Sequence, residues 1–183
     1  MPNSNVKSNT LKLAKMGLML AVTIVCGYVA FPILPFASFL LFELQDIPIL
    51  IAGLVFGPVR GFVIGVVAIV LRAFLLPLPG DYYGVIMHII AIGVYVLVAA
   101  AIYHKFKTKK WGLISLIIGG LCMTAAMMPA NIVVTPIFMG VPVEAVYGML
   151  LPILLPFNLL KMAINTVVVF FLYKRLSPFL HKW

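Results

Sequence analysis

Two basic side chains, Arg72 and Lys161, lie inside apolar segments long enough to span a membrane. An ammonium group placed in hydrocarbon costs roughly 3 kcal/mol or more on insertion scales. Intramembrane ionisable residues therefore usually face the interior of a helix bundle or a wet cavity, where they mark the path of a ligand. These two cations are the first candidates for binding chemistry in the chain.

Further polar residues are predicted at the same depth on neighbouring segments. Asn158 and Lys161 are three residues apart and share a helix face, about 9–14 Å below the outer end of their segment at 1.5 Å per residue. We predict one outward-facing pocket, cationic and with few acids at that depth, which suits a small anionic ligand. Its predicted substrate-binding residues are Tyr83, Arg72, His88, Asn131, Asn158 and Lys161.

Each of these side chains also has a simpler interpretation. Arg72 can extend to the outer headgroups, and His88 can sit at the interface. Asn131 and Asn158 can form hydrogen bonds that join helices. Lys161 lies too deep for easy access to the headgroups, so a role inside the bundle is favoured for it.

Two outer features are also open to more than one interpretation. Tyr82 and Tyr83 can belong to an aromatic belt at the interface, or they can form a lid over the pocket. Asp46, two residues before Pro48, can cap a helix or hold an outer loop in place. Neither role of Asp46 requires ligand contact.

The composition predicts an integral membrane protein. The chain has 183 residues, of which 64% are hydrophobic and only 9% are charged, whereas soluble domains carry about a quarter charged residues. We expect an all-α protein with one six-helix domain over 1–183, residues 1–11 forming a cytoplasmic segment. A shorter helix is expected at 46–57 with a turn at 57–61, and runs long enough to span are 12–31, 59–77, 84–104, 111–138 and 152–173.

The charges predict the orientation of these helices. With a cytoplasmic N-terminus, all basic residues except Arg72 and Lys161 fall on the inner side. The four acids, Glu43, Asp46, Asp81 and Glu144, fall in or beside outer loops. This distribution follows the positive-inside rule and places both termini in the cytoplasm. The excess of basic residues is therefore a topology signal, and nucleic acid is not an expected partner.

Motifs for catalysis are missing from the sequence. It has no G-x-x-x-x-G-K-[ST] loop for ATP, no H-E-x-x-H and no G-x-S-x-G. Cys26 and Cys122 both lie in apolar runs and are expected to be ordinary packing residues, not a disulfide or metal pair. We therefore expect no catalytic residue, metal or cofactor in this chain. Two hypotheses compete with a ligand-binding membrane protein. One is a membrane enzyme that acts on a small amphiphile, and the other is a structural protein without a ligand.

The first apolar run has small residues on one stripe. Ala14, Gly17 and Ala21 recur at spacings of three and four, which lets another helix approach closely. Packing within the chain explains such a stripe, and so does docking to a separate membrane subunit.

Two motifs resemble the S components, the substrate-binding subunits, of energy-coupling factor (ECF) vitamin transporters, especially the riboflavin-type branch. One is Asp46-Ile47-Pro48 followed by Gly53, Gly57-Pro58 and Gly61. The other is Pro156-Phe157-Asn158 followed by Lys161, and Asn131 with Pro136 is similar to the family's fifth helix. The resemblance covers nearly the whole chain.

The resemblance implies a multi-pass protein of a prokaryotic cytoplasmic membrane that captures a vitamin in an outward-facing pocket. It implies docking through the stripe on the first helix to a transmembrane coupling subunit and two ABC-type ATPases, which use the ATP. It also implies delivery by toppling of the S component in the bilayer.

The vitamin is predicted from a departure in the fourth helix. Riboflavin-type members usually have a Gly-Glu-x-x-Asn-Phe pattern there, whereas this chain has "YYGVIMHII" with His88 and no acid. Two cations beside such a pocket suit the carboxylate of pantothenate. The sequence therefore favours pantothenate, with riboflavin as the alternative and another vitamin or precursor as a third possibility.

Overall fold

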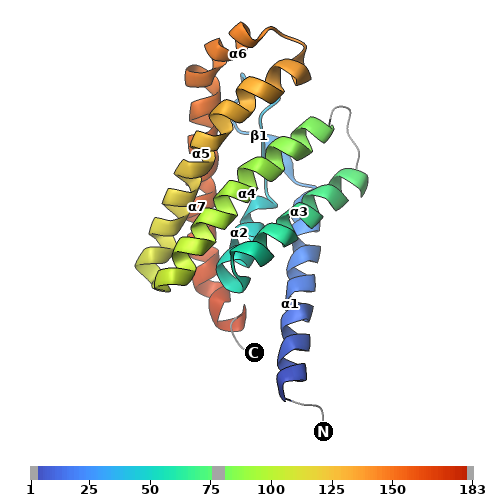
Figure 1. Cartoon of the computed structure of the whole chain (residues 1–183), viewed down its shortest axis with the longest axis vertical. Coiled ribbons are helices and arrows are strands. Elements are labelled where there is room, and N and C mark those ends of the chain that lie inside the picture. Colours follow the sequence, from blue (N-terminus) through green and yellow to red (C-terminus); the bar gives the residue numbers. More distant parts are fainter. Residues whose placement is uncertain (1–3, 76–80, 181–183) are drawn as a thin grey trace.

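A computed structural model describes residues 4–75 and 81–180 of the chain. Figure 1 shows a bundle of helices with a small two-stranded hairpin near one end. The elements, in chain order, are α1 (Ser4–Cys26), β1 (Ala30–Pro32), β2 (Leu41–Glu43), α2 (Asp46–Phe56), α3 (Pro58–Leu75), α4 (Asp81–Phe106), α5 (Lys109–Met139), α6 (Val143–Met149), the π-helical turn η1 (Leu150–Leu154) and α7 (Leu155–Leu180).

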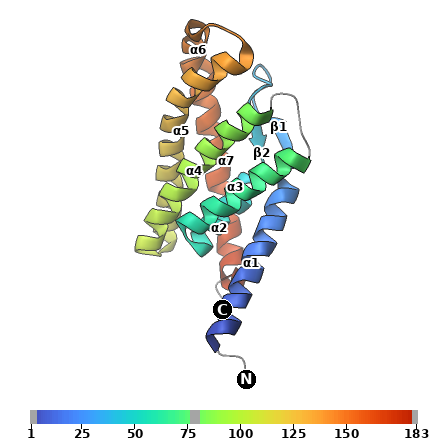
Figure 2. The same ribbon diagram turned by 45° about the vertical axis from the view of Figure 1, so that its right-hand side comes forward.

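The helix lengths confirm the predicted all-α membrane fold. Five helices among the described residues are long and apolar enough to cross a membrane. The sixth, α2, has 11 residues and is therefore only about 16 Å long at 1.5 Å per residue, about half the hydrocarbon thickness. The first turn of α1 and the last turn of α7 lie at the same end of the molecule (Figures 1 and 2), as the charge distribution predicts.

The short helix α2 forms the centre of the bundle. Every one of its residues is buried, and it packs against α1, α3, α4 and α7. Glycines allow its close contact with α3, since a Cβ on Gly61 would collide with the backbone of Gly53. Between the two helices Gly57 adopts a φ of 106°, a conformation that side chains other than glycine rarely adopt. These contacts explain the glycines that follow Pro48 in the sequence.

The segment after α1 differs from the prediction. The first helix ends at Cys26 and does not continue to residue 31, because the chain turns into an antiparallel hairpin that pairs Ala30 with Glu43 and Pro32 with Leu41. Proline at position 32 cannot donate a helical hydrogen bond, which favours the extended conformation there. The predicted turn at 57–61 is also too long, since α3 begins directly at Pro58. The predicted end of this helix near Pro77 lies outside the described residues.

The entry into the last helix contains a feature that the sequence analysis did not predict. The short helix α6 and the π-helical turn η1 precede α7, and Pro152 and Pro156 lie in and just after that turn. A π turn is a single wide turn that often occurs at functional sites. Here it lies directly before Asn158 and Lys161, at the end of the molecule away from the first turn of α1.

Candidate binding site

One cavity of about 260 Å³ lies in the half of the bundle that contains the hairpin. Its volume is close to the lower end of the range for small-molecule pockets, about 300 Å³. The hairpin segment forms one wall through Phe39, Leu40 and Leu41. All six predicted substrate-binding residues line this cavity: Arg72 on α3, Tyr83 and His88 on α4, Asn131 on α5, and Asn158 and Lys161 on α7. Their contact with a ligand remains a prediction.

Lys161 is held by two carboxylates. Its Nζ lies 3.1 Å from Oδ2 of Asp46 and 3.6 Å from Oε2 of Glu43. Lys161 and Asp46 are buried, with 7% and 1% of the side chain exposed, and Glu43 is mostly buried, with 15% exposed. A buried charge is tolerated when it is paired in this way, which answers how a lysine remains in the interior of the bundle.

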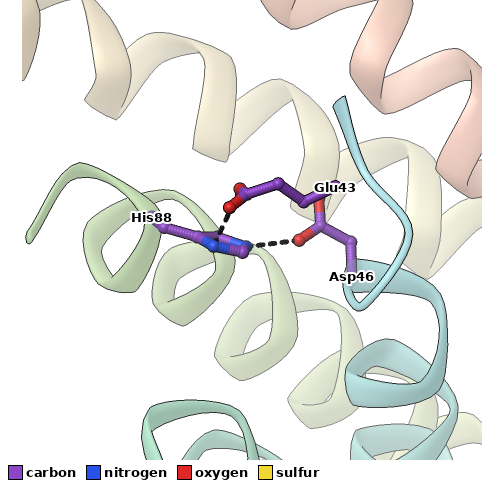
Figure 3. Close-up of side chains that lie close together, drawn as sticks. All are labelled: Glu43, Asp46 and His88. Carbon is purple, nitrogen blue, oxygen red and sulfur yellow. Dashed lines mark hydrogen bonds and ion pairs between the residues drawn. The ribbon is translucent and has the colours of Figure 1, made fainter. Parts of the chain in front are cut away.

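His88 lies between the same two acids, as Figure 3 shows. Its Nδ1 lies 2.8 Å from Oε2 of Glu43, and its Nε2 lies 2.6 Å from Oδ1 of Asp46. An imidazole ring can donate to both carboxylates only as the doubly protonated imidazolium. Nε2 of Gln45 also lies 3.2 Å from Nδ1 of His88. His88 thus joins α4 to the hairpin and to the first residue of α2.

Arg72 completes the network from α3. Its Nη2 lies 3.8 Å from Oε1 of Glu43, and its Nε donates a hydrogen bond of 3.4 Å to the carbonyl of Gly27. The side chains of Arg72, His88 and Lys161 therefore surround Glu43, and those of His88 and Lys161 also contact Asp46. With His88 as imidazolium the network has one net positive charge, and with neutral His88 it has none.

The prediction that few acids lie at the depth of the pocket is therefore wrong. Glu43, at the end of the hairpin between α1 and α2, and Asp46, the first residue of α2, lie at the same depth as the cations. Asp46 is also not the helix cap proposed from the sequence: Gln45 precedes α2 as its cap, and no side-chain hydrogen bond caps that end. The carboxylate of Asp46 instead contacts Lys161 and His88 and accepts a hydrogen bond from Asn165.

The same acids raise the question of a metal site. The ligand atoms of Glu43, Asp46 and His88 all lie within 4.8 Å of one another. However, both ring nitrogens of His88 are already used by the carboxylates, and the Lys161 ammonium supplies positive charge 3.1 Å from Asp46. We interpret the group as an ion-pair network and not as a metal centre.

The two asparagines of the cavity are held by their own helices. Nδ2 of Asn131 donates to the carbonyl of Met127 at 2.7 Å, and Nδ2 of Asn158 donates to that of Leu154 at 2.8 Å. Thr135 donates a hydrogen bond to Oδ1 of Asn131 at 2.9 Å. These bonds run within one helix, so they do not support the alternative that the asparagines join neighbouring helices. They fix the orientation of both amides beside the cavity.

Aromatic side chains form much of the remaining wall. Tyr83, Phe138, Phe157 and Phe39 all line the cavity, from α4, α5, α7 and the hairpin segment. The rings of Tyr83 and Phe138 meet edge to face at 5.9 Å, and Tyr82 lies 4.2 Å from Tyr83. The flat faces of such rings suit a planar aromatic ligand.

Sequence reasoning missed the acidic half of the site. The sequence places Glu43 and Asp46 in or beside outer loops, and it does not reveal that the hairpin brings them to the cations. A signal was present, since a lysine buried in a membrane protein needs a counterion, and these were two of only four acids in the chain. Gln45, buried and lining the cavity beside them, was missed for the same reason.

The stripe on α1 lies away from the cavity. Ala14, Gly17 and Ala21 are all exposed, and a Cβ on Gly17 would meet no atom within 4 Å among the described residues. In both views the N-terminal half of α1 extends beyond the ends of the neighbouring helices (Figures 1 and 2). Packing within the chain therefore does not explain this stripe.

The chain is similar to known proteins over nearly its full length. Riboflavin transporter RibU of Streptococcus thermophilus is 29% identical over 192 residues, covering 96% of this chain and 87% of that protein. RibU of Staphylococcus aureus is 27% identical, with 97% and 96% covered. Riboflavin transporter FmnP of Bacillus subtilis is 25% identical, with 93% and 94% covered.

A solved structure of the S component of a bacterial ECF transporter has the same fold. It superposes with a TM-score of 0.80 at 29% identity, covering 95% of this chain and 99% of that one. A family model described as the substrate-specific component of ECF transporters matches residues 11–173. Since this match includes the cavity, the ion-pair network and most of α1, the protein belongs to the substrate-specific components of ECF transporters.

Proposed function

We propose that this protein captures riboflavin in the cavity between the hairpin and helices α3, α4, α5 and α7. The observation that supports this most is the pairing of the buried cations with Glu43 and Asp46. A pocket whose cations already have carboxylate partners has little need for a carboxylate on its ligand. Riboflavin is neutral, and its ring and ribityl chain offer many hydrogen-bonding groups.

The family determines the setting of this proposal. The chain is a multi-pass transport subunit of a prokaryotic cytoplasmic membrane, not an enzyme. Members of the family bind a vitamin without a cofactor, and the coupling module with its ATPases uses the ATP.

Aromatic walls also favour riboflavin over pantothenate. The isoalloxazine ring is planar and aromatic, so Tyr83, Phe138 and Phe157 can contact its faces and edges. Pantothenate has no ring, and its carboxylate would have to compete with Glu43 for the same cations. The changed fourth helix, which suggested pantothenate, has another explanation in the structure, since His88 is used to join Glu43 and Asp46.

The cavity residues have separate roles in this proposal. The fixed amides of Asn131 and Asn158 form hydrogen bonds with the polar edge of the ring or with the ribityl hydroxyls. Lys161 donates a hydrogen bond to a ligand oxygen while Asp46 retains its charge partner. The three similar proteins that are named riboflavin transporters support the same assignment.

Delivery involves the opposite region of the molecule. We propose that the exposed stripe of Ala14, Gly17 and Ala21 docks to the transmembrane coupling subunit. Toppling of the whole protein in the bilayer would then bring the cavity to the cytoplasmic side, and ATP hydrolysis by the two partner ATPases would reset it.

Quenching of flavin fluorescence tests the assignment. The protein is purified in detergent without its partners and titrated into riboflavin. We expect saturable quenching with one riboflavin per chain. A folded protein that leaves the fluorescence unchanged would contradict the proposal and would direct the search to other vitamins.

A further inference from the structure

The two acids of the ion-pair network have different positions relative to the cavity. Glu43 contributes to the cavity wall, and 15% of its side chain is exposed. Asp46 is 1% exposed and is not part of the lining formed by the described residues. A ligand that enters the cavity therefore meets the carboxylate of Glu43 and not that of Asp46.

Glu43 is also the point at which the cations converge. Its two carboxylate oxygens lie 3.8 Å from Nη2 of Arg72, 2.8 Å from Nδ1 of His88 and 3.6 Å from Nζ of Lys161. These side chains come from three different helices, α3, α4 and α7. Three donors arranged around one carboxylate form a site for an anion, and Glu43 fills that site from within the chain.

We propose that Glu43 determines specificity by occupying this anion position, so that the cavity selects against ligands that have a carboxylate or a phosphate. An anionic ligand must displace Glu43 or lie beside its charge, and both cost free energy in the interior of a helix bundle, where the dielectric constant is low. A neutral ligand meets no such barrier. This inference rests on the proposed capture of riboflavin and adds the class of ligand that the same site rejects.

The location of Glu43 suits it better than Asp46 to exclude anionic ligands. It ends the three-residue strand β2 of the hairpin, whereas Asp46 begins the fully buried helix α2 and also accepts a hydrogen bond from Asn165. Replacing Glu43 by glutamine keeps the size of the side chain and removes its charge. The network then gains one positive charge beside the cavity.

Riboflavin and its 5′-phosphate, flavin mononucleotide, form the ligand pair for the test, because they share the ring and differ in charge. For wild type we expect riboflavin to bind at least about tenfold more tightly. In Glu43→Gln we expect this ratio to fall by about tenfold or more, with riboflavin affinity changed much less. An unchanged ratio in Glu43→Gln, with riboflavin still bound, would overturn the inference.

Two control variants separate a local effect from a general change of charge. Glu144→Gln removes an exposed acid of α6 that is not part of the network, and should leave the ratio at its wild-type value. Asp46→Asn removes the acid that does not line the cavity, and it should shift the ratio of the two flavin affinities less than Glu43→Gln does. An equal shift in Asp46→Asn and Glu43→Gln would overturn the special position of Glu43. Should the variants fail to fold, equal wild-type affinity for both flavins would still overturn the inference.

A separate measurement keeps the inference apart from the proposed function. If wild type binds no flavin, the assignment of riboflavin fails, and the anion position can still be tested with acetate. Glu43→Ala leaves the space of the lost carboxylate, and acetate is the matching small carboxylate. We expect acetate to raise the melting temperature of Glu43→Ala more than that of wild type. An equal rise in both proteins would mean that the three cations form no anion site.

Discussion

The charged residues of the cavity and the small residues on the exposed face of α1 lie in opposite environments. In the cavity, charged side chains from four separate segments are buried and paired within about 4 Å of one another. On α1 the small residues are exposed, and only 11% of the span Asn9–Cys26 is buried. The first region is complete within this chain, apart from a ligand. The second is the surface that we propose docks to the coupling subunit, which would place capture and coupling on different parts of one small fold.

The largest expected effect comes from breaking the cavity network at its most central cation. Lys161→Ala leaves Asp46 and Glu43 without the ammonium that contacts both. Removing one partner of a buried ion pair costs about 3–5 kcal/mol, so both stability and riboflavin binding should suffer, with affinity reduced about 100-fold. Fluorescence titration and thermal unfolding measure the two effects.

Lys174→Ala is the matched control for that variant. It removes an exposed lysine from the same helix, outside the network, and should bind riboflavin as wild type does. Wild-type affinity in Lys161→Ala would remove this lysine from the site.

A smaller effect distinguishes the tight contact between α2 and α3 from the exposed face of α1. Gly61→Ala places a Cβ against the backbone of Gly53 and should lower the free energy of unfolding by about 1–3 kcal/mol. Gly17→Ala meets no atom of the described residues within 4 Å on α1 and should be neutral, or stabilising by about 0.5–1 kcal/mol through helix propensity. Chemical denaturation of both variants measures the difference. Equal losses in the two would mean that α1 packs as tightly as α2.

The exposed stripe can be tested without touching the cavity. Gly17→Leu and Ala21→Leu add bulk where a partner helix is expected to approach, and should lower co-purification of the coupling subunit and ATPases several-fold. Riboflavin binding by the isolated protein should stay unchanged. Intact assembly in both variants would locate the docking surface elsewhere.

The smallest expected effect concerns salt. Because the proposed ligand is neutral, raising the ionic strength from about 0.05 to 0.5 M should change its affinity by less than about twofold, although the cavity is rich in charge. Titrations at several salt concentrations measure this. A steep loss of affinity with salt would indicate an anionic ligand and uncompensated cations.

The sequence allowed good prediction of features that depend on local pattern. Apolar length predicted the spanning helices, and the bias of lysine and arginine predicted that both ends of the chain lie at one end of the molecule (Figure 1). Spacing along one helix placed Asn158 and Lys161 on one face, and both line the cavity in the structure. Each of these inferences needs only neighbouring residues or a simple count.

The features that could not be predicted depend on contacts between distant residues. His88 meets Asp46 and Glu43 across more than 40 residues of chain, so no local pattern indicates their pairing. The hairpin that brings Glu43 to the cavity consists of two three-residue strands, too short to give a recognisable alternation. Because the sequence does not place these acids at the site, it predicts a pocket with unpaired cations. Such a pocket favours the carboxylate of pantothenate.

Calorimetric titration of the purified wild-type protein with riboflavin and with pantothenate tests the neutral-ligand assignment most directly. We expect tight, saturable binding of riboflavin and no measurable heat of binding for pantothenate under the same conditions. Tight binding of pantothenate without binding of riboflavin would contradict the assignment, and would mean that the cations around Glu43 and Asp46 are available to a ligand carboxylate.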